Sequence, residues 1–319
     1  MLFRSKNCPD LLFRCLDALV GQTLGPHAYE VIVVDDGSGG STKRIVEALG
    51  QSSRVPVRYV HAEGRGLAAA RNLGWRAARG PVIAFTDDDT VPDVRWLEAG
   101  LEAMATEQPG GTTADGVMGS ILVPLPDRPS DHERDTAALA AAEFTTANVF
   151  YRRGTLELSG GFDERFATFR EDADIYFTLL EQGAELRKAP DAVVVHPARP
   201  AKWGVSLSQQ RKSQYNALLF RKHPQLFRDR IGSSPRWYYA AVGAFGLSLV
   251  SAFTGRRRTS VLAGIAWFLM TVLFAKKRLV STARTPSHIA EMAVTSAAIP
   301  PLSVYARLKG AVRYRVPYF

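Results

Sequence analysis

The sequence predicts an α/β protein whose doubly wound sheet is followed by an α-helical, membrane-associated region. Two observations support this prediction. Apolar segments typical of buried strands alternate with amphipathic segments typical of helices through the first half of the 319 residues. Residues 1–196 hold 20 Lys and Arg against 29 Asp and Glu, whereas residues 197–319 hold 20 against 2. The acidic first half argues against a nucleic-acid-binding surface there, and the basic, apolar second half suits an anionic membrane surface.

The first half contains strand-like and helix-like segments in strict alternation. In chain order they are expected at 30–35 (strand), 41–49 (helix), 55–60 (strand), 66–78 (helix), 81–86 (strand) and 92–104 (helix). Gly80-Pro81 should end the second helix and Pro92 should open the third. Helices of this length act as crossovers, so neighbouring strands should be parallel. Ligands bind at the carboxyl ends of such strands, where Asp35-Asp36 and Asp87-Asp88-Asp89 lie.

Three consecutive carboxylates, Asp87, Asp88 and Asp89, follow the last of these strands. Adjacent like charges repel one another, so the cluster gains nothing from packing. Oxygen ligands of this kind suit Mg2+ or Mn2+, whose coordination is usually completed by substrate phosphates. The alternative is a solvated acidic turn. The glycine-rich turn at 37–40 fits neither a phosphate-binding loop nor a dinucleotide fingerprint, so a Rossmann-type cofactor site is not expected.

Six short motifs, in order between residues 7 and 196, resemble family 2 glycosyltransferases, which are inverting enzymes with the GT-A fold. The motifs are Val33-Val34-Asp35-Asp36-Gly37-Ser38, Ala70-Arg71-Asn72-Leu73-Gly74, Phe85-Thr86-Asp87-Asp88-Asp89, Ala147-Asn148, Gly160-Gly161-Phe162-Asp163-Glu164 and Glu171-Asp172-Ala173-Asp174. The resemblance implies a GT-A-type mixed, mostly parallel sheet. It also implies a catalytic domain at 1–230, with a nucleotide-sugar half at about 1–125 and an acceptor half at about 126–230. The membrane-associated region then covers 231–319.

The resemblance assigns donor-binding roles to five residues. Asp36 is expected to hydrogen-bond the nucleotide base, and Arg71 to lie near the nucleotide. Asp87 and Asp89 resemble the acid pair that holds the ribose and a divalent cation, Mg2+ or Mn2+, and Asp88 is grouped with the donor contacts. The cation would neutralise charge on the leaving diphosphate.

Asp172 resembles the general base that removes a proton from the acceptor hydroxyl. An aspartate of ordinary pKa is a weak base near pH 7, so Glu171 and Asp174 are expected to raise its pKa by like-charge repulsion. Alternatively, Glu171 and Asp172 cap a helix at 175–182, where the helix dipole favours negative charge. Both roles are compatible.

Two further residues have a functional and a structural interpretation. The resemblance suggests His196, which ends an apolar run, as a metal ligand beside Asp89. A lone histidine after a strand is more often structural. Gly161 is expected to let the backbone approach the donor sugar, and the alternative is an ordinary left-handed turn.

The sequence departs from the family pattern in two places. Only Met1-Leu2-Phe3 precedes Arg4, so the first strand is expected to be short. The Gln-x-x-Arg-Trp signature of processive polysaccharide synthases is absent, which favours transfer of a single sugar. No secretory signal opens the chain, and Cys8 and Cys15 lack a zinc-binding spacing, so the catalytic domain is expected in the cytoplasm.

The second half contains two apolar stretches, at 237–253 and 261–275. As helices they would measure roughly 26 and 23 Å, slightly less than a bilayer core of about 30 Å. Two full crossings would place the intervening Arg256-Arg257-Arg258 on the far side, against the positive-inside tendency. A shallow hairpin or interfacial helices are therefore favoured over two spans and over a buried soluble helical domain. Pro300-Pro301 is expected to interrupt a third stretch, at 292–304.

Together these features predict a metal-dependent inverting glycosyltransferase at the cytoplasmic face of the cell membrane. It would transfer one sugar from a nucleotide-diphosphate sugar to a lipid-linked or glycan acceptor. One alternative is a metal-dependent nucleotidyltransferase, for which only Lys43 and Arg44 could serve a triphosphate near the glycine-rich turn. Another is a non-catalytic membrane adaptor that keeps the fold. The sequence predicts no oligomeric state.

Overall fold

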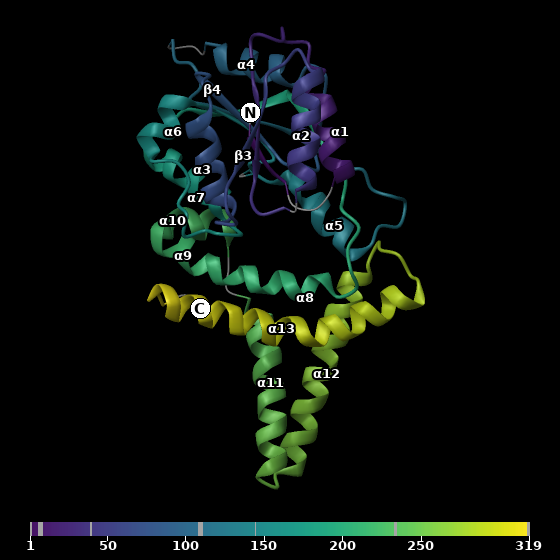
Figure 1. Ribbon diagram of the computed structural model, residues 1–319. Helices are drawn as coiled ribbons and strands as arrows, with labels where there is room; N and C mark the ends of the chain where they lie inside the picture. The colour runs from purple at the N-terminus through teal and green to yellow at the C-terminus, as the bar shows by residue number, and fades with distance from the viewer. Residues whose placement is uncertain are drawn as a thin grey trace. The chain divides into compact units, whose positions relative to one another are not determined.

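The structure is a computed structural model that describes residues 2–5, 9–38, 40–107, 111–143, 145–232 and 235–317. Cys8 and Gly39 lie outside these residues. The chain divides into two compact units (Figure 1). The sheet unit comprises Met1–Pro124 and Ala137–Arg199, and the helical unit comprises Leu125–Thr136 and Pro200–Phe319. The sheet unit ends before residue 230, where the sequence places a functional boundary, and that functional division stays a prediction.

The sheet unit is built on a mixed sheet of eight strands within the described residues, in the order β3-β2-β1-β4-β7-β6-β8-β5. The strands are β1 Leu2–Ser5, β2 Val31–Asp35, β3 Val57–His61, β4 Val82–Thr86, β5 Val91–Pro92, β6 Gly116–Leu122, β7 Asn148–Arg152 and β8 Leu186–Val195. The pairs β3/β2, β2/β1, β1/β4 and β6/β8 are parallel, and β4/β7, β7/β6 and β8/β5 are antiparallel. The prediction of a mixed, mostly parallel sheet is confirmed.

Helices cover both faces of this sheet. They are α1 Pro9–Val20, α2 Ser41–Ser52, α3 Leu67–Ala77, α4 Trp96–Ala105, η1 Ala138–Ala141, α6 Arg153–Ser159 and α7 Glu171–Glu181. Val31 and Val33 of β2 belong to a core with residues of α1 and α4, whereas Ile32 and Val34 belong to a core with residues of α3 and α7. Successive side chains of a strand point to opposite faces, so β2 needs an unbroken apolar run to fill both cores.

Two strands sharpen or correct the sequence-based expectations. The short β1 lies inside the sheet, hydrogen-bonded to both β2 and β4, and completes the parallel part. Pro92 was expected to open a helix, which is wrong, because Val91-Pro92 is a strand. It forms β5, paired antiparallel with Val194 and Val195 of β8, and α4 begins only at Trp96. Pro92 is tolerated because β5 is an edge strand, where a missing N–H is harmless.

The helical unit contains α5 Asp131–Ala137, α8 Val205–Gln209, η2 Gln210–Gln214, α9 Tyr215–Lys222, α10 Pro224–Leu226, η3 Phe227–Ile231, α11 Arg236–Phe253, α12 Arg257–Leu279 and α13 Pro286–Tyr314. The expectation that Pro300-Pro301 would interrupt the last stretch is wrong, because α13 continues through both prolines. Its buried face holds it in place despite the two missing N–H groups. Gly310 lies so close to the carbonyl oxygen of Gln214 that there is no room for a Cβ.

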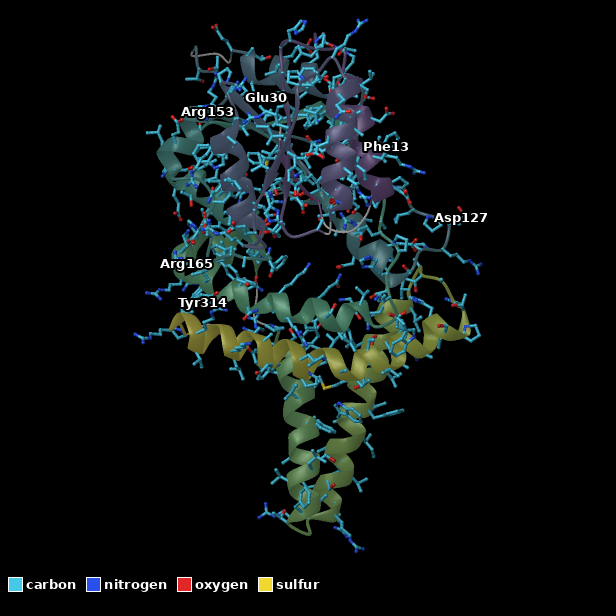
Figure 2. All side chains as sticks on the ribbon, viewed as in Figure 1. Phe13, Glu30, Asp127, Arg153, Arg165 and Tyr314 are labelled. Atoms are coloured by element: carbon cyan, nitrogen blue, oxygen red, sulfur yellow. The ribbon has the colours of Figure 1, made fainter. Side chains whose placement is uncertain are left out.

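Helices α11 and α12 form a hairpin that projects from α13 within the helical unit (Figure 1). The hydroxyls of Ser248 and Ser260 each donate to the other residue's carbonyl oxygen at 2.9 Å, and the rings of Phe245 and Trp267 lie 5.1 Å apart. Among the described helices, α12 and α13 are long and apolar enough to cross a membrane. Only 6% of the apolar stretch of α12 is buried, against 44% for α13. Most side chains of α12 are therefore accessible to the surroundings (Figure 2).

A buried cation anchors the base of this hairpin. Arg278, near the end of α12, pairs with Asp131 of α5 through Nη2 and Oδ2 at 2.7 Å. Its Nη1 donates to the Thr295 hydroxyl of α13 at 2.6 Å, and its Nη2 donates to the Ser206 hydroxyl of α8 at 3.2 Å. One guanidinium therefore ties four helices of the unit together.

Candidate active site

The three acids stand at the carboxyl end of β4, on a turn held by two hydroxyls. Thr86, the last residue of β4, donates to the carbonyl of Ala147 at 2.9 Å, and its hydroxyl lies 2.6 Å from that of Thr90. The Thr90 hydroxyl also lies 2.8 Å from the carbonyl oxygen of Asp87, to which it donates. Asp88 and Asp89 are buried, with 3% and 6% of their surface exposed, while Asp87 is half-buried. A solvated acidic turn would not bury two adjacent carboxylates.

Three of the predicted metal ligands come together at this turn. The ligand atoms of Asp87, Asp89 and His196 all lie within 4.8 Å of one another. His196 follows β8, and its backbone N–H donates to the carbonyl of Leu122, which fixes the main chain at His196 beside the end of β6. The distance from His196 Nε2 to Asp89 Oδ1 is 3.6 Å. Two carboxylates and an imidazole can hold a divalent cation.

Sequence reasoning missed Arg199, which joins the two buried acids. Its Nε donates to Asp89 Oδ2 and its Nη2 to Asp88 Oδ1, each at 2.5 Å. No motif in the sequence marks this residue, because its partners are more than a hundred positions away. Its only signal is its place three residues after His196, just beyond the end of β8.

Arg71 connects the acidic turn to the predicted base. Arg71, in α3, donates from Nη1 to Glu171 Oε1 at 2.5 Å, and its Nη2 lies 3.4 Å from Asp87 Oδ1. Glu171 and Asp172 form the first turn of α7, which begins at Glu171 rather than at Ile175 as expected. The second oxygen of Glu171 is buried without a hydrogen-bond partner among the described residues.

The environment of Asp172 makes it a better base than an ordinary aspartate. Burial, and then the negative charge of Glu171, raise the pKa of Asp172 to about 7. Arg71, and a hydrogen bond at 2.7 Å from the N–H of Ala173, act in the opposite direction. Asp174, also expected to raise this pKa, is buried in the same helical turn and is not among the main causes. A pKa near 7 suits general-base catalysis at neutral pH.

Asp36 lies at the carboxyl end of β2, on the same edge of the sheet as the acids. It is buried, and its Oδ1 accepts a hydrogen bond from the N–H of Gly66 at 3.1 Å, at the start of α3. The neighbouring Asp35 accepts from the Tyr59 hydroxyl at 2.9 Å, and burial followed by this hydrogen bond raises the pKa of Tyr59 to about 12. The expected hydrogen bond between Asp36 and the nucleotide base stays a prediction.

The glycine motif forms a turn that Asn72 holds against α3. Asn72 donates to the carbonyl of Phe162 at 2.7 Å and accepts from the Phe162 N–H at 2.9 Å. Gly161 adopts φ +76°, and a Cβ there would lie 2.7 Å from Asn72 Oδ1. The structure thus shows the left-handed turn for Gly161, while its contact with a donor sugar stays a prediction. The role of Asn72 was missed, although it lies in a quoted motif.

Asn148, in another quoted motif, serves the sheet itself. Its side chain is fully buried and donates to the carbonyls of Ser120 and Ala192 at 2.8 Å each. It accepts from the indole of Trp96 at 2.8 Å. These bonds satisfy the carbonyls at the irregularity between β6 and β8, where the register shifts after Gly119.

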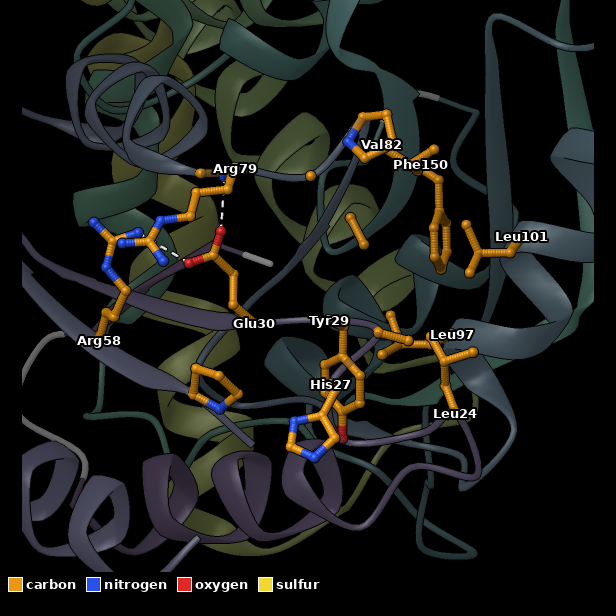
Figure 3. Close-up of a pocket in the computed structure, with 16 residues that line it drawn as sticks. Leu24, His27, Tyr29, Glu30, Arg58, Arg79, Val82, Leu97, Leu101 and Phe150 are labelled. Atoms are coloured by element: carbon orange, nitrogen blue, oxygen red, sulfur yellow. Dashed lines mark hydrogen bonds and ion pairs between the residues drawn. The ribbon is translucent and has the colours of Figure 1, made fainter. Parts of the chain in front are cut away.

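A cavity of about 480 Å3 lies at the opposite edge of the sheet (Figure 3). Its lining includes Glu30, Pro56 and Pro81, which directly precede β2, β3 and β4. Glu30 accepts from Arg58 at 2.9 Å and from the N–H of Arg79 at 2.7 Å. The cavity is therefore separate from the acidic turn, which lies at the carboxyl ends of the strands.

The sequence of this chain is similar to those of known glycosyltransferases. The family model for glycosyl transferase family 2 matches residues 4–171. Glycosyltransferase AglE of Haloferax volcanii is 30% identical over 204 residues, covering 59% of this chain and 62% of AglE. Validoxylamine A glucosyltransferase of Streptomyces hygroscopicus subsp. limoneus is 25% identical over 283 residues, covering 75% of this chain and 59% of that protein. The chain thus spans about three-fifths of the length of these curated relatives.

A solved structure supports the fold over almost the whole chain. The mannosyltransferase PcManGT of Pyrobaculum calidifontis, in complex with GDP-Man and Mn2+, matches with a TM-score of 0.58 and 22% identity. The match covers 96% of this chain and 86% of PcManGT. Because the family model covers more than half of the residues and the sheet has the expected mixed strand order, the chain belongs to glycosyl transferase family 2 and has the GT-A fold.

Proposed function

We propose that the protein transfers a single sugar from a nucleotide-diphosphate sugar to an acceptor hydroxyl, with inversion at the anomeric carbon. One observation carries this proposal: Arg71 connects an acidic turn suited to a diphosphate-bound cation with Glu171, next to a carboxylate whose pKa is near 7. A nucleotidyltransferase would need free cations for a triphosphate near the glycine-rich turn. Lys43 there pairs with Glu47 at 3.7 Å, and family membership favours sugar transfer over nucleotidyl transfer or a non-catalytic adaptor.

The donor would bind along the carboxyl edge of the sheet. Asp87, Asp89 and His196 would hold Mg2+ or Mn2+, which supplies positive charge to the diphosphate of the leaving group. PcManGT, with its Mn2+ and GDP-mannose, supports this assignment by its fold. Asp36 would contact the base, and Asp88 and Gly161 would line the donor site.

Asp172 would act as the general base. Near neutral pH about half of these carboxyl groups are ionised, because the pKa lies near 7. The carboxylate takes the proton of the acceptor hydroxyl while that oxygen attacks the anomeric carbon. One base and one direct displacement invert the configuration. Glu171 would support the general base, Asp172, through its negative charge.

A binding screen tests the donor assignment. Each common nucleoside diphosphate is added with Mn2+ to the full chain, and the melting temperature is measured. A ligand that binds only the folded state stabilises it, by about 2.7 kcal/mol at a hundred times its Kd. We expect one base to stabilise strongly in a Mn2+-dependent manner. Equal, small shifts for all bases with and without Mn2+ would contradict the proposal.

We also propose that the protein acts at the cytoplasmic face of the cell membrane, on a lipid-linked or glycan acceptor, and is attached by the α11–α12 hairpin. Phe253 and Leu262 are 90% and 68% exposed, which is unfavourable in water and favourable in lipid. Uncharged stretches of about 28 and 26 Å, at 1.5 Å per residue, separate the basic residues at the base from Arg256-Arg257-Arg258 at the tip. This length approaches the bilayer core.

Labelling of the hairpin tip distinguishes shallow insertion from crossing. Thr254→Cys, in a chain with Cys8 and Cys15 replaced by serine, is treated with a membrane-impermeant maleimide in intact cells. Ser281→Cys, at the exposed base of α12, is the matched control. A crossing hairpin exposes the tip outside, whereas a shallow one needs permeabilised cells for both sites. Labelling of Ser281→Cys in intact cells would contradict the cytoplasmic orientation.

A further inference from the structure

A guanidinium bridges the two buried acids of the acidic turn, Asp88 and Asp89. The Asp88 and Asp89 side chains are 4% and 8% exposed, and Arg199 reaches them from the segment after β8 with 35% of its side chain exposed. Nε contacts one carboxylate and Nη2 the other, each at 2.5 Å. Adjacent buried carboxylates repel one another, and the guanidinium between them offsets this repulsion.

The bridge also determines which oxygen of Asp89 is presented to a ligand. Arg199 takes Oδ2, and Oδ1 is left 3.6 Å from His196 Nε2. Oδ1 thereby lies on the side of the imidazole, and one oxygen of Asp89 is among the ligand atoms that gather within 4.8 Å. The guanidinium is planar and rigid, so the N–H that holds Asp88 also fixes where the other N–H meets Asp89 Oδ2.

We propose that Arg199 is a positioning residue that holds Asp89 in its metal-binding orientation. The proposal rests on the proposed function and deepens it. Arg199 acts through Asp89 and not on the reacting atoms, as outer partners of metal ligands do elsewhere, where their loss lowers metal affinity about 10–100-fold. Lysine cannot replace it, because one ammonium cannot contact both carboxylates with the same fixed geometry.

Charge and positioning predict opposite effects when the guanidinium is removed. If Arg199 only repelled an incoming cation, its loss would strengthen metal binding. If it positions Asp89, its loss weakens metal binding, because the carboxylate then rotates freely. The sign of the change therefore identifies the role. A purely structural role would lower the melting temperature and leave the metal affinity of the folded fraction unchanged.

The experiment measures Mn2+ binding by calorimetry in the full chain, with the nucleoside diphosphate that stabilises it most. For Arg199→Gln we expect Mn2+ affinity to fall on the order of tenfold. Arg199→Lys keeps the charge and should lose nearly as much, and it also serves if Arg199→Gln fails to fold. Arg95→Gln is the control, because Arg95 makes only exposed ion pairs with Glu98 and Glu102.

Three outcomes would overturn the proposal. Tighter Mn2+ binding in Arg199→Gln would make Arg199 a competitor of the cation. Wild-type Mn2+ affinity in Arg199→Gln or in Arg199→Lys would show that metal binding does not depend on the guanidinium of Arg199. Absence of Mn2+ binding to the wild-type chain with every nucleoside diphosphate would overturn the metal-dependent function as well, so the two failures are distinguishable.

Discussion

The sheet unit and the helical unit place charged and apolar groups in opposite ways. At the carboxyl edge of the sheet, Asp88, Asp89 and Glu171 are buried. In the α11–α12 hairpin, large apolar side chains are exposed, with Phe253 at 90%. Buried charges are costly in a soluble fold and mark a ligand site, whereas exposed apolar surface marks a partner other than water. Each unit therefore has an arrangement that is unfavourable on its own. The buried acids of the sheet unit support the proposed donor site, and the exposed apolar side chains of the hairpin support the proposed lipid contact.

The largest effect is expected from replacing the proposed general base, Asp172. Asp172→Asn removes the proton acceptor but keeps the shape of the side chain, so turnover should fall by about 10²–10⁴-fold. Initial rates with a donor and acceptor check this, and calorimetry should show donor binding nearly unchanged. Turnover close to wild type would remove Asp172 from the mechanism.

Loss of a ligand should be the next largest effect. Asp89→Ala removes one of the three ligand groups and one of the two carboxylates that Arg199 contacts, so Mn2+-dependent binding of the nucleoside diphosphate should weaken at least about tenfold. Calorimetry with and without Mn2+ measures the change. Glu102→Ala, an exposed acid of α4, is the matched control. Unchanged Mn2+ dependence in Asp89→Ala would refute the metal site.

The same substitution in the two units tests the comparison directly. Phe268 of α12 is 59% exposed, and Leu158 of the sheet unit is 85% exposed. Phe268→Asp should cost about 2.5–3.5 kcal/mol of insertion if the hairpin lies in lipid, whereas Leu158→Asp should have little effect in water. Flotation with anionic vesicles measures the bound fraction. Equal flotation of the two variants would mean that the hairpin is not in the membrane.

Protonation of Asp172 predicts a pH dependence. The base must be ionised, so the rate should rise with pH through about 7. In Glu171→Gln the rise should move to lower pH, because a neighbouring negative charge is gone and Arg71 is no longer neutralised by it. A rise at the same or higher pH would exclude Glu171 as a cause.

The free energy of unfolding should fall as the pH rises, which is opposite to the trend of the rate. Unfolded Asp172 loses its proton near pH 4 and the folded residue only near 7, so the folded state binds more protons between these values. Its contribution to stability is therefore complete below about pH 4 and is lost as the pH rises through 7. Denaturation of Asp172→Asn alongside wild type should show that this loss disappears.

The smallest effect concerns two helical glycines of the second unit. Gly310→Ala places a Cβ against the carbonyl of Gln214, whereas Gly243→Ala has open space. The first should lower the melting temperature, and the second should raise stability by up to about 1 kcal/mol through helix propensity. Melting in detergent compares them. A stabilised Gly310→Ala would mean that α13 does not pack closely on η2.

The local sequence pattern was enough to predict the buried central strands. The strands at 30–35 and 81–86 were predicted within one residue of β2 and β4, because each fills two cores and reads as an unbroken apolar run. The start of α4 was wrong, because Val91-Pro92 takes its conformation from β8. Arg199 could not be foreseen, since its contacts join residues 110 and 111 positions apart. Asn72 and Asn148 lay in recognised motifs, but only the structure shows what they bond.

The pairing of Arg278 with Asp131 has a consequence for dividing the protein. Asp131 belongs to the helical unit, although in sequence it sits inside the segments that build the sheet unit. The two units are therefore interleaved along the chain and are not successive cassettes. Truncation of the chain at residue 230 would remove Arg278, the ion-pair partner of Asp131. It would also remove α13, which packs against η2 and α9. Exchange of the helical unit between relatives would have to include residues 125–136 together with residues 200–319, because the unit is built from both segments.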